Sequence, residues 1–319
     1  MPSQQQPAID LRGLRKVYGR GEHALTAVDG VTLQVPRGQV FAFLGPNGAG
    51  KTTTIKMTSG LLTPTAGEVW IGGFHLRRQR AHAVLQLGAV LEGSRNVYWP
   101  LTAWQNLLYF GRLKGLGARE IRPRAERLLS ELGLWERRHE AVGGFSRGMQ
   151  QKVAIAAALI TDPPVLLLDE PTIGLDVEAA RTVRGWVRRL AREEGKTVVL
   201  TTHQLEIVQE LADRVAVIRQ GSIIADLPTP ELVGRFREDR FQIQVAAPAD
   251  GLAAALPAGA RTEATEEGTR IVLPGAGQTG LYQVLADVQR RRLPLVSVAQ
   301  VQPSMEDIFL RLLNEDERS

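Results

Sequence analysis

The stretch that decides the fold is Gly45-Pro46-Asn47-Gly48-Ala49-Gly50-Lys51-Thr52, which fits the pattern G-x-x-x-x-G-K-[ST]. An apolar run at 40–44 precedes it and predicts a buried strand, and residues 53–57 predict the start of a helix. Glycines let a backbone wrap closely around phosphate groups, and free N–H groups at a helix start attract anions. The stretch therefore predicts a nucleotide phosphate site between a strand and a helix.

The side chains of this loop have separate predicted roles. We expect Lys51 to reach the β- and γ-phosphates and the Thr52 hydroxyl to bind Mg²⁺. The loop backbone from Gly45 through Thr53 is expected to surround the nucleotide. A glycine-rich turn that matches by chance is the alternative. It is disfavoured because strand, loop, helix and an acidic strand end further along agree.

That acidic strand end is Asp169-Glu170, which follows four apolar residues at 165–168. Doubly wound sheets place their ligands at the carboxyl ends of such buried strands. We expect Asp169 to hold the Mg²⁺ shell and Glu170 to act as general base on the attacking water. Taken alone, an apolar run that ends in Asp-Glu is an ordinary strand end about as often as a catalytic one. The pairing with Lys51 favours the catalytic interpretation.

Three motifs indicate the kind of nucleotide hydrolase, and the first is Phe145-Ser146-Arg147-Gly148-Met149. It resembles the signature of the ATP-binding-cassette (ABC) family, Leu-Ser-Gly-Gly-Gln, in which Ser146 and Gly148 match and the other three residues depart. A serine hydroxyl and a glycine N–H at a helix start form a second phosphate site. Ser146 can also be a plain helix N-cap, and both roles are compatible.

The same resemblance assigns roles to three further residues. Asp176, in the segment 173–176, resembles the D-loop aspartate at the family's dimer contact. His203 resembles the switch histidine that contacts the γ-phosphate, and an imidazole can donate a hydrogen bond near neutral pH. Tyr18 occupies the place of the aromatic residue that stacks on adenine. The ordinary alternatives are a structural histidine and a surface tyrosine.

One position departs from the family pattern. After the strand predicted at 87–91 the family usually has a glutamine that touches Mg²⁺ and couples to the membrane partner, and this chain has Glu92. A carboxylate can also ligate Mg²⁺. Its charge would slow hydrolysis unless a cation such as Arg95 offsets it. Gln86 is a weaker candidate because it precedes the strand.

Composition limits the class of protein. The chain has 319 residues, which suits one large core and a small domain, and its 44% hydrophobic content is ordinary for a globular protein. It has no cysteine, which excludes disulfides and cysteine metal sites. No run approaches the roughly 20 apolar residues that a membrane span needs. A transport function therefore requires a separate membrane subunit.

The net charge of +5 raises the question of an acidic partner. Much of the positive charge lies in short runs such as Arg137-Arg138, Arg188-Arg189 and Arg290-Arg291-Arg292. Such runs are typical of solvated faces, and they lack the interleaved aromatics of single-strand binders. We therefore expect no nucleic-acid partner.

The chain as a whole predicts an α/β fold. We expect a P-loop NTPase cassette at 8–235, with an antiparallel β-subdomain at its start and a helical signature subdomain at about 95–160. The prolines at 228 and 230 predict turns before a helix at 231–237. Residues 240–319 predict a small C-terminal α+β domain with strands at 241–245, beside Glu267-Gly268 and at 294–298, and helices at 280–290 and 305–313. Tyr98, Trp99 and Trp104 either form a docking surface or pack inside the helical subdomain.

The cassette resemblance covers about residues 8–235, and the segment 303–309 resembles the C-terminal end of daunorubicin-resistance-type subunits. Together these resemblances imply an ATP- and Mg²⁺-dependent ATPase that is the motor of an exporter. They also imply a place on the cytoplasmic face of the cell membrane. In the family each ATP lies between the loop of one cassette and the signature of the other, so one loop and one signature per chain imply a head-to-tail homodimer. The γ-phosphate would lie between Lys51 and His203 of one chain and Ser146 and Gly148 of the other.

Separate integral-membrane permease subunits would be driven by this motor and would choose the cargo. Two alternatives stay open. One is a soluble cassette ATPase acting on ribosomes or nucleic acid, although such members usually carry two cassettes or a long coiled-coil insertion. The other is the motor of an importer, which would need a solute-binding protein as well.

Overall fold

The computed structural model describes residues 6–93, 96–235, 240–248, 256–257, 259–273, 277–301 and 310–312. The chain divides into two compact units, Met1–Thr229 and Pro230–Ser319. Each unit has its own sheet and its own buried core. The first unit contains all the predicted nucleotide-site residues.

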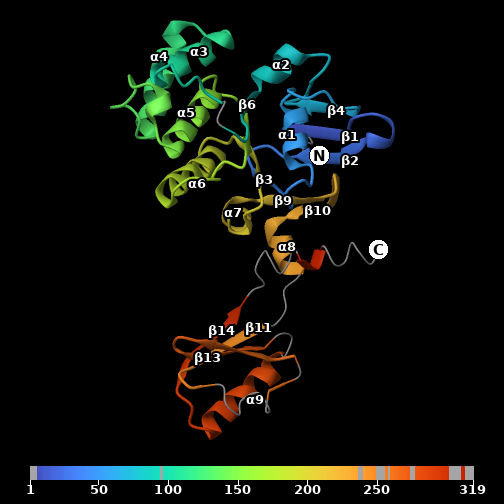
Figure 1. The fold of residues 1–319 in the computed structure, drawn as a ribbon, viewed down its shortest axis with the longest axis vertical. Helices are drawn as coiled ribbons and strands as arrows, with labels where there is room; N and C mark the ends of the chain where they lie inside the picture. The colour runs from blue at the N-terminus through green and yellow to red at the C-terminus, as the bar shows by residue number, and fades with distance from the viewer. Residues whose placement is uncertain are drawn as a thin grey trace, which may run out of the picture. The chain divides into compact units, whose positions relative to one another are not determined.

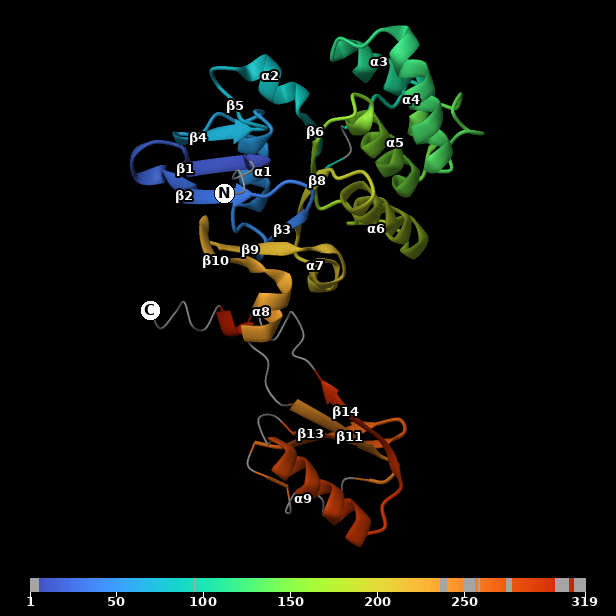
Figure 2. The ribbon, with the colours of Figure 1, turned by 180° about the vertical axis from the view of Figure 1, so that it is seen from behind.

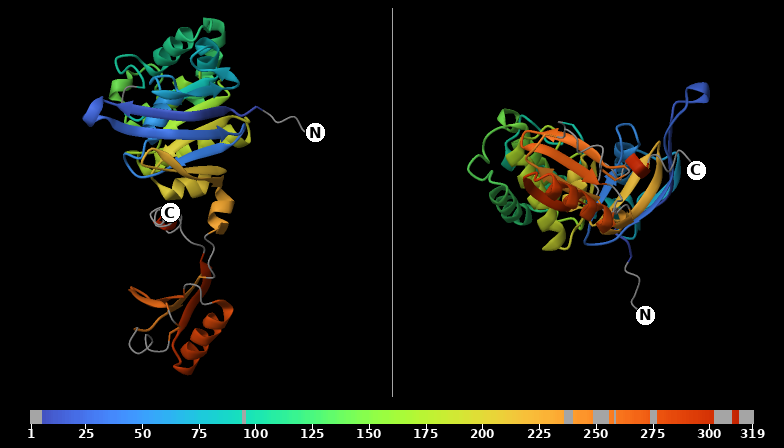
Figure 3. Two further views of the ribbon diagram at one scale, coloured as in Figure 1. Left: turned by 90° about the vertical axis from the view of Figure 1, so that its right-hand side faces the viewer. Right: turned by 90° about the horizontal axis from the view of Figure 1, so that it is seen from below.

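The first sheet of this unit is antiparallel, with the order β2-β1-β4-β5. Its strands are β1 (Ile9–Tyr18), β2 (Leu25–Val35), β4 (Ala66–Ile71) and β5 (Phe74–His75). Figure 3 shows the long β1–β2 pair, in which Ile9 lies opposite Val35 and Tyr18 opposite Leu25. The antiparallel β-subdomain predicted at the start of the cassette is confirmed.

The second sheet has the order β10-β9-β3-β8-β7-β6, and all its neighbours are parallel except β9 and β10. Its strands are β3 (Val40–Leu44), β6 (Leu87–Val90), β7 (Val165–Asp169), β8 (Thr197–Thr202), β9 (Arg214–Arg219) and β10 (Ser222–Pro228). Every residue of β3, β7 and β8 is buried, which explains the continuous apolar runs of β3 and β7. Strand β8 therefore separates β3 from β7.

One turn prediction was wrong. Pro228 is the last residue of β10, at the sheet edge, rather than part of a turn. An edge strand tolerates proline because its missing N–H leaves no ladder bond unmade. The helix predicted at 231–237 begins earlier, as α8 (Thr229–Arg235), with Pro230 in its first turn.

The two sheets enclose one core around helix α1 (Lys51–Thr58). Ile55 and Met57 of α1 are fully buried in the same cluster as Leu14 of β1 and Phe41 of β3. Helices α6 (Val177–Arg192) and α7 (Leu205–Leu211) pack against β3 and β8 on the other face of the parallel sheet (Figures 1 and 2). A short helix, α2 (Arg80–Leu85), precedes β6.

The predicted helical subdomain contains α3 (Ala103–Leu113), α4 (Ala118–Glu131) and α5 (Arg147–Leu159), shown in green in Figure 1. The start of α3 is a capping box. The Thr102 hydroxyl accepts from the Gln105 N–H (3.1 Å), and the Gln105 side chain accepts from the Thr102 N–H (2.9 Å). Thr102 therefore caps the first turn of α3.

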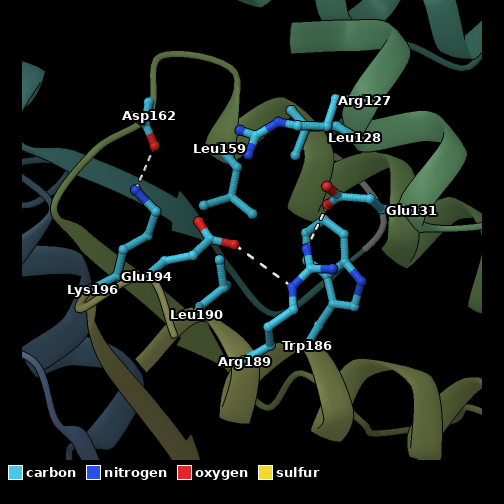
Figure 4. A pocket seen from close by; sticks show the side chains of 10 residues that line it. All are labelled: Arg127, Leu128, Glu131, Leu159, Asp162, Trp186, Arg189, Leu190, Glu194 and Lys196. Atoms are coloured by element: carbon cyan, nitrogen blue, oxygen red, sulfur yellow. Dashed lines mark hydrogen bonds and ion pairs between the residues drawn. The ribbon is translucent and has the colours of Figure 1, made fainter. Parts of the chain in front are cut away.

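Charged side chains connect α4 to α6, and the residue before β8 to the loop after α5 (Figure 4). Arg189 of α6 forms ion pairs with Glu131 of α4 and with Glu194. Lys196, beside β8, donates to the carboxylate of Asp162 (2.5 Å), and this bond lowers the pKa of Asp162. These ion pairs thus link α4, α6 and the start of β8.

The second unit has an antiparallel sheet of order β12-β13-β11-β14 with helix α9 (Gly277–Arg290) packed on one face. The strands are β11 (Arg240–Val245), β12 (Arg261–Thr265), β13 (Gly268–Leu273) and β14 (Leu295–Val301), and they confirm the predicted strands. Of the predicted final helix only 310–312 is described, and it is helical; the segment 303–309 lies outside the described residues. No described helix is both long and apolar enough to span a bilayer.

Asn106 is a fully buried polar residue that fixes the backbone leading into the helical subdomain. Its side-chain oxygen accepts from the Tyr98 N–H (2.8 Å), and its amide donates to the carbonyls of Tyr98 and Thr102 (both 3.0 Å). We predict that Asn106→Ala lowers the free energy of unfolding by about 1–3 kcal/mol, because these backbone groups lose their partner. Urea unfolding followed by circular dichroism measures the change.

Arg112→Ala is the control, because this side chain is exposed on the same helix. It should change the free energy of unfolding by no more than about 0.5 kcal/mol. Equal stability of the two variants would contradict the role given to Asn106.

Candidate nucleotide site

The phosphate loop connects β3 to α1, and two of its glycines are required by close backbone approach. A Cβ at Gly45 would lie 2.3 Å from the Ile218 carbonyl oxygen, and one at Gly50 would lie 2.5 Å from the Ala27 carbonyl oxygen. Gly50 also begins α1 with a φ of 104°, in the left-handed region. The loop therefore lies tightly between β2 and β9, with its backbone at the start of the helix.

Lys51 is buried at the base of this loop. Its Nζ donates to the carbonyls of Gly45 (2.8 Å) and Pro46 (3.1 Å) and lies 3.9 Å from Oε1 of Glu170. Burial lowers the pKa of Lys51, and neighbouring carboxylates, Glu170 first, oppose that shift. A buried cation at a helix start is suited to hold a phosphate group.

The carboxylate of Asp169 is 1% exposed and joins three elements. Its Oδ1 accepts from the hydroxyls of Thr201 on β8 (2.5 Å) and Thr52 on α1 (3.1 Å). Its Oδ2 accepts from the Glu92 N–H, which follows β6, at 3.5 Å. No local pattern in the sequence indicates a role for Thr201. It lies beside Asp169 because β8 is inserted between β3 and β7.

Glu170 directly follows β7, and both its backbone and its side chain are held by hydrogen bonds. Its N–H donates to the hydroxyl and the carbonyl of Thr201 (3.1 and 3.2 Å), and its Oε1 lies 3.0 Å from Nδ1 of His203. Its φ of 48° is in the left-handed region, where a residue with a Cβ is strained. This strain, together with 8% exposure, is typical of a functional carboxylate.

These groups surround one pocket of about 310 Å³, a volume at the lower end of the range of ligand sites. It is lined by Ala27, Asn47, Gly48, Gly50, Lys51, Thr52, Thr53, Glu92, Glu170, Ile173 and His203. All but Ala27 and Ile173 were predicted. Nothing in a single apolar residue indicates that it will line a pocket. Ala49 is buried in the core, behind the loop.

Other predicted residues do not line this pocket. Tyr18, at the end of β1, is 40% exposed, and the ammonium of Lys16 lies 5.3 Å from its ring centre. Gln86 caps the end of α2. Adenine stacking by Tyr18 stays a prediction.

The signature and D-loop residues also lie outside the pocket, where they have local structural contacts. Ser146 is the N-cap of α5, with its hydroxyl accepting from the Met149 N–H (3.3 Å), and Asp176 is the N-cap of α6. A Cβ at Gly148 would lie 2.6 Å from the Cβ of Ala179, so the glycine lets α5 approach α6. Their phosphate and dimer roles stay predictions.

The donor set suits Mg²⁺ bound together with a nucleotide. The Thr52 hydroxyl and the carboxylates of Asp169 and Glu92 supply the hard oxygen ligands that Mg²⁺ prefers. Within the described parts of the chain, no three His, Asp or Glu side chains are grouped so that they could hold a metal ion. Mg²⁺ usually keeps several waters and binds through few carboxylates plus substrate phosphates, which fits this arrangement. Arg95 lies outside the described residues.

Comparison with known proteins places the chain in one family. A family model described as ABC transporter matches residues 28–173. The daunorubicin resistance ATP-binding protein DrrA3 of Streptomyces coeruleorubidus is 38% identical over 315 residues, covering 98% of this chain and 97% of that protein. The ABC transporter ATP-binding protein NatA of Bacillus subtilis (strain 168) is 43% identical over 216 residues, covering 68% and 87%.

Among solved structures, one similar chain is a dimeric ATP-binding cassette in a post-hydrolysis state bound to ADP and Pi. It has a TM-score of 0.63 and 28% identity and covers 69% of this chain and 98% of that one. The fold and site thus define a P-loop NTPase of the cassette type. The chain belongs to the ABC transporter family, as an ATP-binding subunit, and its enzymatic activity is that of an ATPase. The predicted family and fold class are confirmed.

Thr201 gives a test of the site geometry. Thr201→Val removes the hydroxyl that donates to Asp169 and accepts from the Glu170 N–H. A hydrogen bond to a charged group contributes about 1.5–3 kcal/mol, so we predict a fall in kcat of about 10- to 100-fold. Steady-state release of phosphate from ATP measures it.

Thr202→Val is the matched control. This neighbour is equally buried, and its hydroxyl accepts from the Gln204 N–H rather than contacting Asp169. Its kcat should stay within a few-fold of the parent chain. A Thr201→Val enzyme as active as Thr202→Val would show that the Asp169 contact is dispensable.

Proposed function

We propose that this ATPase is the motor of an exporter, working as a homodimer that drives separate permease subunits. The observation that carries the hydrolytic part is the position of Glu170. Its Oε1 lies 3.0 Å from His203 and 3.9 Å from Lys51, at the edge of the pocket that the phosphate loop lines. A carboxylate so placed can reach a water in line with the γ-phosphate.

In the proposed reaction Lys51 and the loop N–H groups bind the β- and γ-phosphates. Thr52 and Asp169, with Glu92 nearby, would hold Mg²⁺, which neutralises phosphate charge when bound. Glu170 takes a proton from the attacking water. The oxygen of that water bonds to the γ-phosphorus, and ADP leaves. His203 orients Glu170 through Oε1 and contacts the γ-phosphate.

The proposed dimer follows from what one chain's pocket lacks. Ser146, Gly148 and Asp176 have satisfied local contacts and do not line the pocket of their own chain. In a head-to-tail homodimer with two-fold symmetry they would complete the pocket of the second copy. ATP would favour the closed pair because it contacts both chains only in that state. A dimeric cassette among the similar structures supports this arrangement.

Aromatic and aliphatic side chains offer a docking surface for the permease. Tyr98, Trp99 and Tyr109 are 49%, 45% and 40% exposed, and Leu113 is 67% exposed beside a cavity of about 370 Å³ along α3. Such a group suits protein contact. Trp104, in contrast, packs edge-on against Trp135 within the subdomain, with ring centres 5.9 Å apart. The predicted aromatic cluster thus divides between exposed side chains and the half-buried Trp104.

Export is favoured by the relatives whose match extends over the whole chain. DrrA3 and the daunorubicin/doxorubicin resistance protein DrrA of Streptomyces peucetius match 98% and 100% of it, at 38% and 36% identity. A permease partner would place the chain on the cytoplasmic face of the membrane.

Capture of the Glu170→Gln chain with Mg-ATP from solubilised native membranes tests whether a permease binds this chain. A stoichiometric polytopic protein supports the transporter, and ribosomal or DNA-associated proteins would favour the soluble alternative.

Glu170→Gln tests the general base. The amide keeps the shape of the side chain but cannot take a proton, so we predict unchanged ATP affinity and a loss of kcat of at least about 100-fold. Binding of a fluorescent ATP analogue and single-turnover hydrolysis separate the two effects. Near-normal hydrolysis would remove Glu170 from this role.

Lys51→Ala tests the phosphate loop. Loss of the buried ammonium should weaken ATP binding itself, by at least about 10-fold, measured by the same fluorescent analogue. Lys56→Ala, which removes an exposed lysine from the same helix, should bind ATP as the parent chain does. Equal affinities of the two variants would count against the loop assignment.

A further inference from the structure

Three residues of the segment 145–149 depart from the signature pattern, and the structure separates their roles. Phe145 and Met149 both contact Arg137. Its guanidinium carbon lies 5.1 Å from the centre of the Phe145 ring, and its Nη1 donates to the Met149 sulfur (3.2 Å). Arg137 also forms an ion pair with Glu140 at 2.6 Å. These two departures thus hold an arginine whose charge is already neutralised.

Arg147, the third departure, has no such partner. Its side chain is exposed, and no carboxylate of the described residues forms an ion pair with it. A Cβ at Gly174 would lie 3.2 Å from its Nη1, so the guanidinium lies beside the turn that leads to Asp176 and α6. Helices α5 and α6 lie side by side (Figures 1 and 2). Arg147 is therefore an available cation between Ser146 and Gly148, the residues proposed to meet the second copy.

The nucleotide pocket has the opposite imbalance of charge. The carboxylates of Glu92 and Glu170 line it, and that of Asp169 lies behind them, with its Oδ2 3.5 Å from the Glu92 N–H. Among the described residues that line the pocket, Lys51 is the one lysine or arginine. A nucleoside triphosphate carries more negative charge than one Mg²⁺ neutralises. Closing the loaded pocket would therefore bury an excess of negative charge, which is costly unless a cation enters.

We propose that Arg147 enters the nucleotide pocket of the second copy and binds the phosphate oxygens of the ATP held there. The inference rests on the proposed head-to-tail dimer, which brings the neighbouring Ser146 and Gly148 to the same phosphates. A guanidinium binds phosphate oxygens through parallel N–H groups and stays charged at physiological pH. Glu92 and Arg147 both depart from the family pattern, and in this arrangement their opposite charges offset each other in one site.

The position of Arg147 fits the second copy's nucleotide better than its own. Its side chain does not line its own chain's pocket, and the part of the adjacent turn that does is Ile173. Ser146 and Asp176, on either side of the guanidinium, are engaged as the N-caps of α5 and α6. A contact made only in the closed pair stabilises that pair alone. Arg147 therefore strengthens the ATP-induced dimer without changing the affinity of a single chain for ATP.

Dimerisation induced by ATP measures this contact. In the full-length Glu170→Gln chain, Arg147→Gln should weaken the dimer at least about 10-fold in sedimentation equilibrium, because both sites of the pair lose a cation. At concentrations where the chains are monomeric, its affinity for a fluorescent ATP analogue should stay unchanged. Arg147→Lys, which keeps the charge, should restore most of the dimer. Arg122→Gln, which removes an exposed arginine from α4, should leave the dimer as it is.

Removal of the opposing charge gives a second test in the same Glu170→Gln chain. Glu92→Gln combined with Arg147→Gln should dimerise more tightly than Arg147→Gln alone, because less negative charge is then left unbalanced.

Four results would overturn the proposal. They are an undiminished dimer of Arg147→Gln, a double variant no tighter than the single one, weaker ATP binding by the monomeric Arg147→Gln chain, and a dimer weakened by Arg95→Gln instead. A Glu170→Gln chain that stays monomeric with ATP would overturn the proposed dimer itself, so the failure of the proposed function is recognised separately.

Discussion

The buried carboxylate of Asp169 is the constraint on which the nucleotide site depends. A carboxylate that is 1% exposed is costly unless it is hydrogen-bonded, and its partners come from three different elements. Thr52 is on α1, Thr201 is on β8, and the Glu92 N–H follows β6. Satisfying one charge thus brings the phosphate loop, the neighbouring strand and the loop after β6 to the same edge of the sheet.

The position of Glu170 follows from this arrangement. Thr201, which binds Asp169, also accepts the Glu170 N–H and so holds a backbone with a φ of 48°. The side chain then lies between Lys51 and His203, which is the geometry that a general base needs. The groups proposed to complete the site from a second chain cap α5 and α6 instead. In the proposed dimer each chain would therefore present a half-site and a complementary surface.

The sequence by itself determined the strand, loop and helix at 40–58, the acidic strand end at Asp169-Glu170 and the cap at Thr102, because these are local patterns of period, glycine placement and hydrogen bonding. It misplaced Pro228 because a proline at a strand edge and one in a turn look alike along the chain. Only the tertiary structure decided that β8 lies between β3 and β7, which gives Thr201 its role, and that Tyr98 and Trp99 are exposed while Trp104 packs on Trp135. Strand order and exposure depend on contacts between segments far apart in sequence, which no local pattern encodes.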